Sequence, residues 1–148
     1  SGESLDVIIA SMVLEHLFDP FGVVQEIAGK LRKGGQFLFS TVVCDSLDAK
    51  IYKGYYGGFD LPRHMVFFKK RDIFRMLERD FTNIECFHQN APIDFVRSSS
   101  WRRGGQKGGL FDRLVLSIGD SRTGFLLVLP LASLGITCRV SFRCRKRD

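Results

Sequence analysis

Apolar residues recur along the chain with two periods, one typical of strands and one typical of helices. Residues 5–10 form a short, nearly continuous apolar run rich in β-branched side chains, and residues 37–43 form a second one. Such runs are typical of strands buried on both faces of a parallel sheet. The segment between them has one apolar face at helical spacing, made of Phe21, Val24, Ile27, Ala28 and Leu31. This order of strand, helix and strand predicts a right-handed βαβ unit.

The helix in this unit has signals at both ends. Asp19 can cap its first turn, and Pro20 suits the first helical position. Cations favour the negative pole of the helix dipole at the other end, where the candidates are Lys30, Arg32 and Lys33. Gly34 can adopt the left-handed conformation that closes a helix. We therefore expect the helix to continue through these basic residues.

The middle of the chain alternates between irregular and regular patterns. Residues 44–68 are rich in Tyr and Gly and predict a long loop, which in a compact domain is usually functional or disordered. A helix is expected at about 70–79 and a strand at 81–88. Residues 98–109 are polar, basic and Gly-rich, which predicts a mobile segment, and an amphipathic helix follows at 110–118.

The clearest alternation lies near the end of the chain. Apolar residues at Ile136, Cys138, Val140, Phe142 and Cys144 alternate with Thr137, Arg139, Ser141, Arg143 and Arg145. This pattern predicts a half-buried strand over 136–145 with a basic outer face. Just before it, residues 124–136 form the longest apolar stretch, which Pro130 interrupts. The stretch is shorter than the ~20 residues that cross a bilayer, so we expect a core segment, or at most a membrane-surface one.

Composition narrows the class of protein. The 148 residues suffice for one domain with a hydrophobic core. The net charge is +6, and basic residues gather in the Gly-rich segment and near the C-terminus. Such a surface can attract nucleic acid, anionic lipid or an acidic substrate, although a solvated face is the simpler interpretation. The four cysteines form no CxxC pair and no signal-peptide pattern is visible, which favours free thiols in the cytoplasm.

Polar residues follow the first predicted strand, at the edge of the sheet where open α/β proteins bind ligands. They are Ser11, Glu15 and His16. His16 can act as a general base near neutral pH, and Glu15 can orient it, bind substrate or cap the next turn. The alternative is that both side chains only satisfy backbone groups at a strand-to-helix junction.

A second polar group follows the aromatic part of the 44–68 segment. Arg63 can bind an acidic or polar substrate group through two hydrogen bonds, and His64 is a second acid–base candidate. Together with Tyr55 they suggest a substrate-binding lid. The alternative is a loop anchored by an arginine hydrogen bond. His88 lies inside a strand pattern and is expected to be structural.

Four segments carry a resemblance to a known family. They are Leu5–Ile9, the Val-Leu-Glu-His-Leu-Phe-Asp-Pro sequence of Val13–Pro20, the Lys-Gly-Gly within Leu31–Ser40, and the Pro-Arg-His within Asp60–Phe68. In this order they resemble the class I S-adenosylmethionine-dependent methyltransferases, and more narrowly the ubiquinone-type and small bacterial members. The similarity covers residues 5–90, and the remainder agrees only in the arrangement of its elements.

The resemblance implies a Rossmann-like α/β fold, in which parallel strands and one antiparallel edge hairpin form a seven-stranded sheet. It also implies that residues 1–148 are the C-terminal part of a single methyltransferase domain. In the family, the Gly-rich turn that holds the methionine part of the cofactor and the acid that binds its ribose both lie upstream. S-adenosylmethionine is the implied cofactor. The contacts with it that remain in this chain are Ala10, Ser11 and Met12.

The implied activity is methyl transfer to an oxygen, or less readily a nitrogen, of a small molecule or envelope precursor, with His16 and Glu15 as catalytic residues. Some ubiquinone-type relatives are thought to bind a metal through a further acid three residues before this Glu. Met12 stands at that position, so no metal is expected. Two other classes stay open: a non-catalytic basic module for RNA or anionic membrane, and an inactive fragment. No specific nucleic-acid partner is expected, while peripheral membrane contact and homo-oligomer formation stay open.

Overall fold

Four strands form one sheet in the order β1-β2-β4-β3 in the computed structural model, which describes residues 4–119 and 121–147. The strands are β1 (Leu5–Ser11), β2 (Leu31–Val42), β3 (Phe81–His88) and β4 (Arg139–Lys146). β1 runs parallel to β2, and β4 lies antiparallel between β2 and β3. This confirms the predicted α/β class, with its parallel strands and its antiparallel hairpin at the edge.

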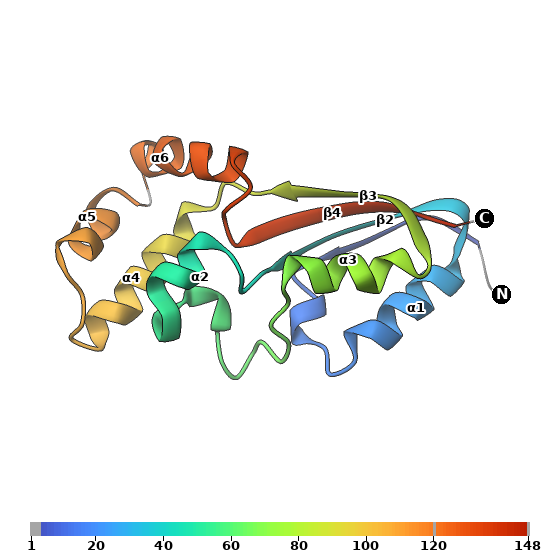
Figure 1. Ribbon diagram of the computed structural model, residues 1–148, viewed down its shortest axis with the longest axis horizontal. Helices are drawn as coiled ribbons and strands as arrows, with labels where there is room; N and C mark the ends of the chain where they lie inside the picture. The colour runs from blue at the N-terminus through green and yellow to red at the C-terminus, as the bar shows by residue number, and fades with distance from the viewer. Residues whose placement is uncertain (1–3, 120, 148) are drawn as a thin grey trace.

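Helices cover one face of the sheet and the region beyond the carboxyl ends of β1 and β2 (Figure 1). On the covered face lie α1 (Pro20–Lys30) and α3 (Lys70–Glu78). Beyond the strand ends lies a group that we call the helical module, made of α2 (Leu47–Tyr52), α4 (Pro92–Gly104), α5 (Leu110–Ile118) and α6 (Arg122–Ser133). Short 3-10 turns complete the chain at η1 (Leu14–His16), η2 (Lys53–Tyr55) and η3 (Gly57–Phe59).

The main hydrophobic core lies between the sheet and helices α1 and α3. Phe37, Phe39 and Phe142 point from neighbouring strands into this layer, and the ring centroids of Phe39 and Phe142 lie 5.1 Å apart. Ile73 and Leu77 of α3 are fully buried against them. Each such side chain contributes roughly 1.5–3 kcal/mol when it leaves water. This core fixes the strand ends at which the candidate site lies.

A second core holds the helical module together. Tyr52 and Tyr56 are almost fully buried and pack near Phe95, Val128 and Cys138. Their hydroxyl groups have partners: Tyr52 bonds to the Ser99 hydroxyl at 2.7 Å, and Tyr56 donates to the carbonyl of Val43 at 2.9 Å. The bond from Tyr56 ties the module directly to the end of β2.

The opposite face of the sheet is open. Ile9 on β1 is 72% exposed, and Phe87 on β3 is 52% exposed. β1 pairs with β2 on one side, and the described residues provide no strand on its other side. Because β1 alternates between the core face and this open face, it is half-covered here, whereas its sequence predicts burial on both faces.

Two predicted boundaries at the start of the chain need correction. α1 begins as expected, with Pro20 first and the Asp19 side chain accepting from the Gly22 N–H. However, it ends at Lys30, and Arg32 and Lys33 belong to β2. Gly34 does have a positive φ of 71°, but it lies within β2 and not at a helix cap.

Two segments predicted to be irregular contain helices. The 44–68 segment holds α2, η2 and η3, and the polar 98–109 segment begins within α4. Their polar residues are used inside the module: the Ser46 hydroxyl accepts from the Ala49 N–H, and the buried Ser98 hydroxyl accepts from the Gly57 N–H and donates to the Asp94 carbonyl. Buried hydrogen bonds of this kind give serine-rich stretches a packed structure.

The later elements confirm most of the pattern. α3, β3 and α5 lie where expected, and β4 starts at Arg139, slightly later than predicted. The long apolar stretch, expected to be a core segment or at most a membrane-surface one, is mostly the helix α6. Among its residues only Gly124, Val128 and Ala132 are buried, so it is not a core segment. His88 bonds to the Thr137 carbonyl at 2.8 Å, consistent with a structural role. The cysteines are free thiols.

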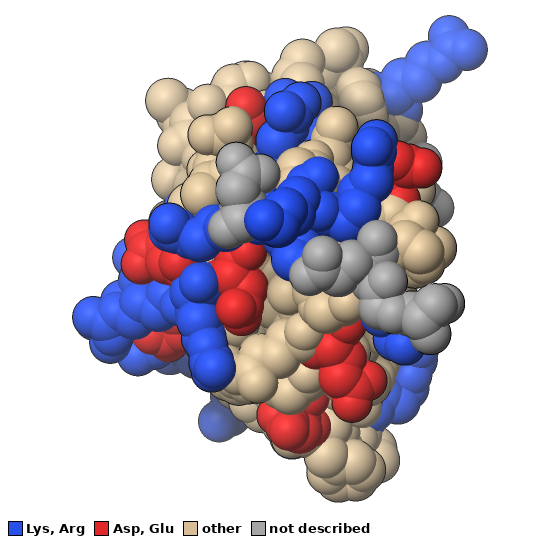
Figure 2. All heavy atoms as spheres, turned by 90° about the vertical axis from the view of Figure 1, so that its right-hand side faces the viewer, with Lys and Arg blue, Asp and Glu red and all other residues tan. Residues whose placement is uncertain are grey.

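Basic side chains gather at the end of the sheet where β1, β2 and β3 begin (Figure 2). Acidic groups lie among them: Arg32 pairs with Asp6, and Arg79 lies 4.0 Å from Asp80. The basic C-terminal strand ends here, away from the carboxyl ends of β1 and β2. A mixed, solvated surface accounts for this part of the positive charge.

Candidate functional site

The carboxyl end of β1 presents the three residues predicted to contact a cofactor. Ala10 is partly buried, and the Ser11 side chain is exposed with its hydroxyl 3.0 Å from the Ser40 hydroxyl of β2. The Met12 N–H donates to the Ser40 carbonyl, and Met12 has a φ of 52°, a left-handed conformation that is uncommon outside glycine. The chain therefore leaves the sheet sharply at Met12, with Ser11 open to a ligand.

Glu15 is buried and joins three separate segments. Its Oε2 accepts a hydrogen bond of 2.8 Å from the Thr41 hydroxyl on β2, and its backbone carbonyl accepts from the N–H groups of Met65 and Val66. Its Oε1 is buried without a partner among the described residues. A buried carboxylate oxygen without a partner is costly, which makes it a candidate ligand for a cation.

His16 and His64 lie together although they are distant in sequence. Their ring centroids are 4.8 Å apart in an edge-to-face arrangement. The Nδ1 of His16 lies 2.8 Å from the Arg63 carbonyl, and the Nδ1 of His64 lies 2.6 Å from the Gly58 carbonyl. A carbonyl only accepts hydrogen bonds, so each Nδ1 acts as the donor, and the Nε2 atoms take no part in these two bonds. His64 is buried, whereas His16 is partly exposed and so is the accessible base.

Glu15, His16 and His64 also form a group that can hold a metal ion. One ligand atom from each lies within 4.8 Å of the others. Histidines that bind metals commonly donate the other ring N–H to a carbonyl, as both do here. The prediction that no metal binds rests only on the residue at position 12, and it stays a prediction.

The other two predicted substrate residues lie on the same side of the molecule but differ in surroundings. Arg63 has a 69% exposed side chain that pairs with Asp60 at 3.2 Å. Tyr55 packs against the core of the helical module, close to Gly105. Arg63 is therefore free to turn toward a ligand, whereas Tyr55 contributes to the module that lies beyond the strand ends.

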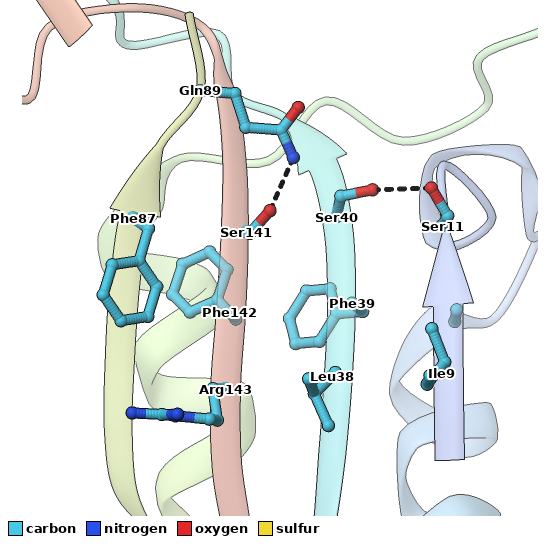
Figure 3. A pocket seen from close by; sticks show the side chains of 11 residues that line it. Ile9, Ser11, Leu38, Phe39, Ser40, Phe87, Gln89, Ser141, Phe142 and Arg143 are labelled. Atoms are coloured by element: carbon cyan, nitrogen blue, oxygen red, sulfur yellow. Dashed lines mark hydrogen bonds between the residues drawn. The ribbon is translucent and has the colours of Figure 1, made fainter.

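A shallow hollow of about 370 Å³ opens on the uncovered face of the sheet (Figure 3). The Ser11 and Ser40 hydroxyls lie at one side, and the Gln89 side chain donates to the Ser141 hydroxyl at the same end of the strands. Its floor is apolar. This hollow lies on the face opposite to the main core, so the two serines border it while Thr41 and Glu15 belong to the other face.

Sequence reasoning did not single out Ser40 or Thr41. Both lie on β2 and bond to residues of the predicted site. A signal was present, because these two polar residues interrupt the apolar run of residues 37–43 in its carboxyl-terminal half. The same rule that indicated Ser11 and Glu15 would have found them.

A comparison with family models settles the class. The methyltransferase domain family, Methyltransf_23, matches residues 1–86. The chain belongs to this methyltransferase family. No curated protein matches the sequence at a significant level.

Solved methyltransferase structures share the fold of the chain. One is the phosphoethanolamine N-methyltransferase 2 of Haemonchus contortus in complex with S-adenosyl-L-methionine, at 14% identity and a TM-score of 0.55, with 100% of this chain and 34% of that chain covered. A methyltransferase of Thermotoga maritima gives 13% identity, a TM-score of 0.60, and 99% and 58% coverage. A methyltransferase of Archaeoglobus fulgidus shares 15% identity with a TM-score of 0.57, and the match covers 98% of this chain and 61% of that chain.

The methyltransferase chain spans from about a third to three fifths of the length of these structures. At such identities the similarity establishes the fold alone. The overall fold is therefore shared. The chemistry has to be argued from the residues at the carboxyl end of β1.

Proposed function

We propose that the chain is the C-terminal part of an S-adenosylmethionine-dependent methyltransferase that methylates an oxygen atom of a small molecule or an envelope precursor. The observation that carries this proposal is the hydrogen bond of His16, whose Nδ1 lies 2.8 Å from the Arg63 carbonyl. The Nε2 atom is left available at the edge of the sheet where α/β enzymes bind their ligands. The alternatives of a non-catalytic basic module and an inactive fragment have no comparable observation in their favour.

The cofactor assignment rests on family membership and on the open end of β1. S-adenosylmethionine supplies an activated methyl group on a sulfonium. Ala10, Ser11 and Met12 are the residues that we propose contact it, because the Ser11 side chain is exposed there and the chain turns away at Met12. The unpaired side of β1 and the partial coverage of the solved structures support a further, upstream part of the domain that completes the cofactor site.

His16 favours an oxygen acceptor over a nitrogen acceptor. A hydroxyl group must lose its proton as its oxygen takes up a methyl group, and Nε2 of His16 can accept that proton. A neutral amine attacks through its own lone pair and needs no base before the transfer. Glu15 holds His16 in place by anchoring η1 to β2 and to residues 65–66, so it is a positioning residue.

Arg63, His64 and Tyr55 are the proposed substrate side of the site. Arg63 is exposed next to His16 and can bind an acidic or polar group of the acceptor. His64 is buried and supports the His16 ring from the side. Tyr55 belongs to the module that would close over the acceptor.

The proposal is tested by transfer of tritium from methyl-labelled S-adenosylmethionine into the small-molecule and lipid fractions of an extract. The protein used in this assay should contain the chain together with the residues encoded upstream of it. We expect a labelled product, and mass spectrometry should show that its new methyl group is bonded to oxygen. The His16→Ala variant should lose most of the transferred label. A methylated nitrogen would refute the oxygen assignment, and the absence of any transfer or cofactor binding would refute the enzyme.

A further inference from the structure

Helices α5 and α6 expose more large apolar side chains than is usual for a helix surface that faces water. The exposed side chains are Leu110, Leu114, Phe125, Leu126, Leu129 and Leu134, with Leu110 at 83% and Leu134 at 72%. Residues 123–138 contain no charged residue at all. Contiguous exposed apolar patches are rare on monomeric soluble proteins and usually mark a binding surface.

Exposed cations lie on α5 and α6, at the end of α4 and on the segment that leads into α5. Arg103, Lys107, Arg113 and Arg122 are all exposed. No carboxylate within residues 4–119 and 121–147 forms an ion pair with any of them. Asp112 lies in the same stretch, but its carboxylate is buried and occupied by Arg102 at 2.6 Å. Among the described residues, the surface therefore combines exposed apolar side chains with positive charge.

Contacts inside the helical module, including the pair of Arg102 and Asp112, hold α5 and α6 in place. Arg102 donates to Asp112 through both Nε and Nη2, and its guanidinium lies 4.6 Å from the centre of the Tyr52 ring. These contacts fasten α5 to α4 and α2. α6 is attached by its stripe of Gly124, Val128 and Ala132. The apolar side chains on the outer side of both helices are therefore exposed while the helices stay packed on the module.

No described helix is by itself long and apolar enough to cross a membrane. α5 and α6 pass that test together, by length and composition, but they are bent by 112° at the break between them. Two short helices at such an angle suit a position within a membrane surface, where apolar side chains enter the acyl region and cations reach the headgroups.

We propose that α5 and α6 dock the protein onto an anionic lipid bilayer. The positive charge of the surface favours an anionic bilayer as its partner. Each Lys or Arg near an anionic leaflet strengthens the electrostatic attraction, and apolar side chains strengthen binding by entering the acyl region. The single tryptophan, Trp101, is 40% exposed at the end of α4 and would lie at the headgroup level. This inference rests on residues separate from those that carry the proposed function.

Cosedimentation with vesicles tests the proposal. We expect the protein to bind vesicles of phosphatidylcholine and phosphatidylglycerol, with weaker binding at higher salt or without phosphatidylglycerol. The double variant Leu126→Asp, Leu134→Asp should reduce binding about tenfold or more, since it places charge in the acyl region. Arg113→Glu with Arg122→Glu should remove the preference for the anionic lipid. Phe18→Asp is the matched control, because Phe18 is 88% exposed on a different surface, and it should bind normally.

Fluorescence of Trp101 gives a second measurement on the unaltered protein. Its emission should shift to the blue with anionic vesicles and be quenched by brominated lipid. Failure to bind these vesicles, or an equal loss of binding with Phe18→Asp, would overturn the proposal. So would a dimer in lipid-free solution that Leu126→Asp dissociates, because a second copy would then be the occupant of this face.

Discussion

At the scale of single residues, the proposed chemistry depends on the hydrogen bonds that orient His16, His64 and Glu15. The Nδ1 atoms of His16 and His64 are both committed to carbonyl groups, and Glu15 keeps one buried oxygen unpaired. These three residues lie within reach of one another only because η1 and the segment after η3 meet in the fold. The sequence predicts each residue as a candidate, and the structure supplies their proximity.

His16→Ala should lower kcat about 100-fold or more with the acceptor identified by labelling, because the proton of the acceptor then has no base. The affinity for S-adenosylmethionine should change little, since His16 does not belong to the proposed cofactor contacts. Steady-state kinetics and calorimetric titration measure the two quantities. Unaltered turnover would make His16 a structural residue. A loss of activity on chelation that a divalent cation restores would instead favour metal binding by the group.

Asp48 provides a residue-scale prediction about stability. Its carboxyl group is buried, its Oδ2 has no partner among the described residues, and burial raises its pKa above the ordinary value of 3.8. Between that value and the raised one, the folded state keeps a proton that the unfolded state loses. The free energy of unfolding therefore falls as the pH rises through this window.

Asp48→Asn removes the ionisable group and keeps the size of the side chain. We expect the free energy of unfolding to rise by about 1 kcal/mol at pH 7, the scale of one unsatisfied buried polar group, with a smaller gain near pH 4. Thermal unfolding at both pH values measures this, and Asp72→Asn on the surface is the control. A lower free energy of unfolding for the Asp48→Asn variant at neutral pH would show that the charged carboxylate is stabilised in place.

At the scale of elements, the segment from η3 to α3 connects the candidate site to the helical module. Arg63 supplies its carbonyl to His16 and leaves its guanidinium exposed beside Asp60. The Met65 and Val66 N–H groups fasten the following residues to Glu15. A segment held at these points and exposed at Arg63 suits a substrate-binding edge.

Arg63→Ala should raise KM for the acceptor roughly tenfold and leave KM for S-adenosylmethionine nearly unchanged. The backbone carbonyl that orients His16 remains in this variant, so kcat should fall little. Arg71→Ala, an exposed arginine on α3, serves as the control in the same assay. Equal increases in both KM values would argue against a substrate role for Arg63.

The elements also show how far sequence reasoning reaches. β1, the start of α1 and β4 were predictable because their apolar spacing and their cap residues are local signals. α2 and α4 were not predictable in this way. The serines and arginines of α4 resemble a loop until Tyr52, Gly57 and Asp112 are brought to them by the fold. The pairing of His16 with His64 is of the same kind, since it depends on distant contacts.

At the scale of the whole molecule, the described residues form a helix-covered sheet with one open face and with β1 and β3 as its two edge strands. Exposed apolar strand edges tend to pair with another chain or segment. The family membership, the partial coverage of solved methyltransferases and the exposed β1 together support an upstream part of the domain. Without it, residues 1–148 should self-associate in a sedimentation run.

Calorimetric titration with S-adenosylmethionine tests this account most directly. The cofactor should bind one-to-one to the protein that carries the upstream sequence, and weakly or not at all to residues 1–148 alone. The reason is that only Ala10, Ser11 and Met12 of this chain are proposed to contact it. One-to-one binding at micromolar concentration by a monomer of residues 1–148 would contradict the account.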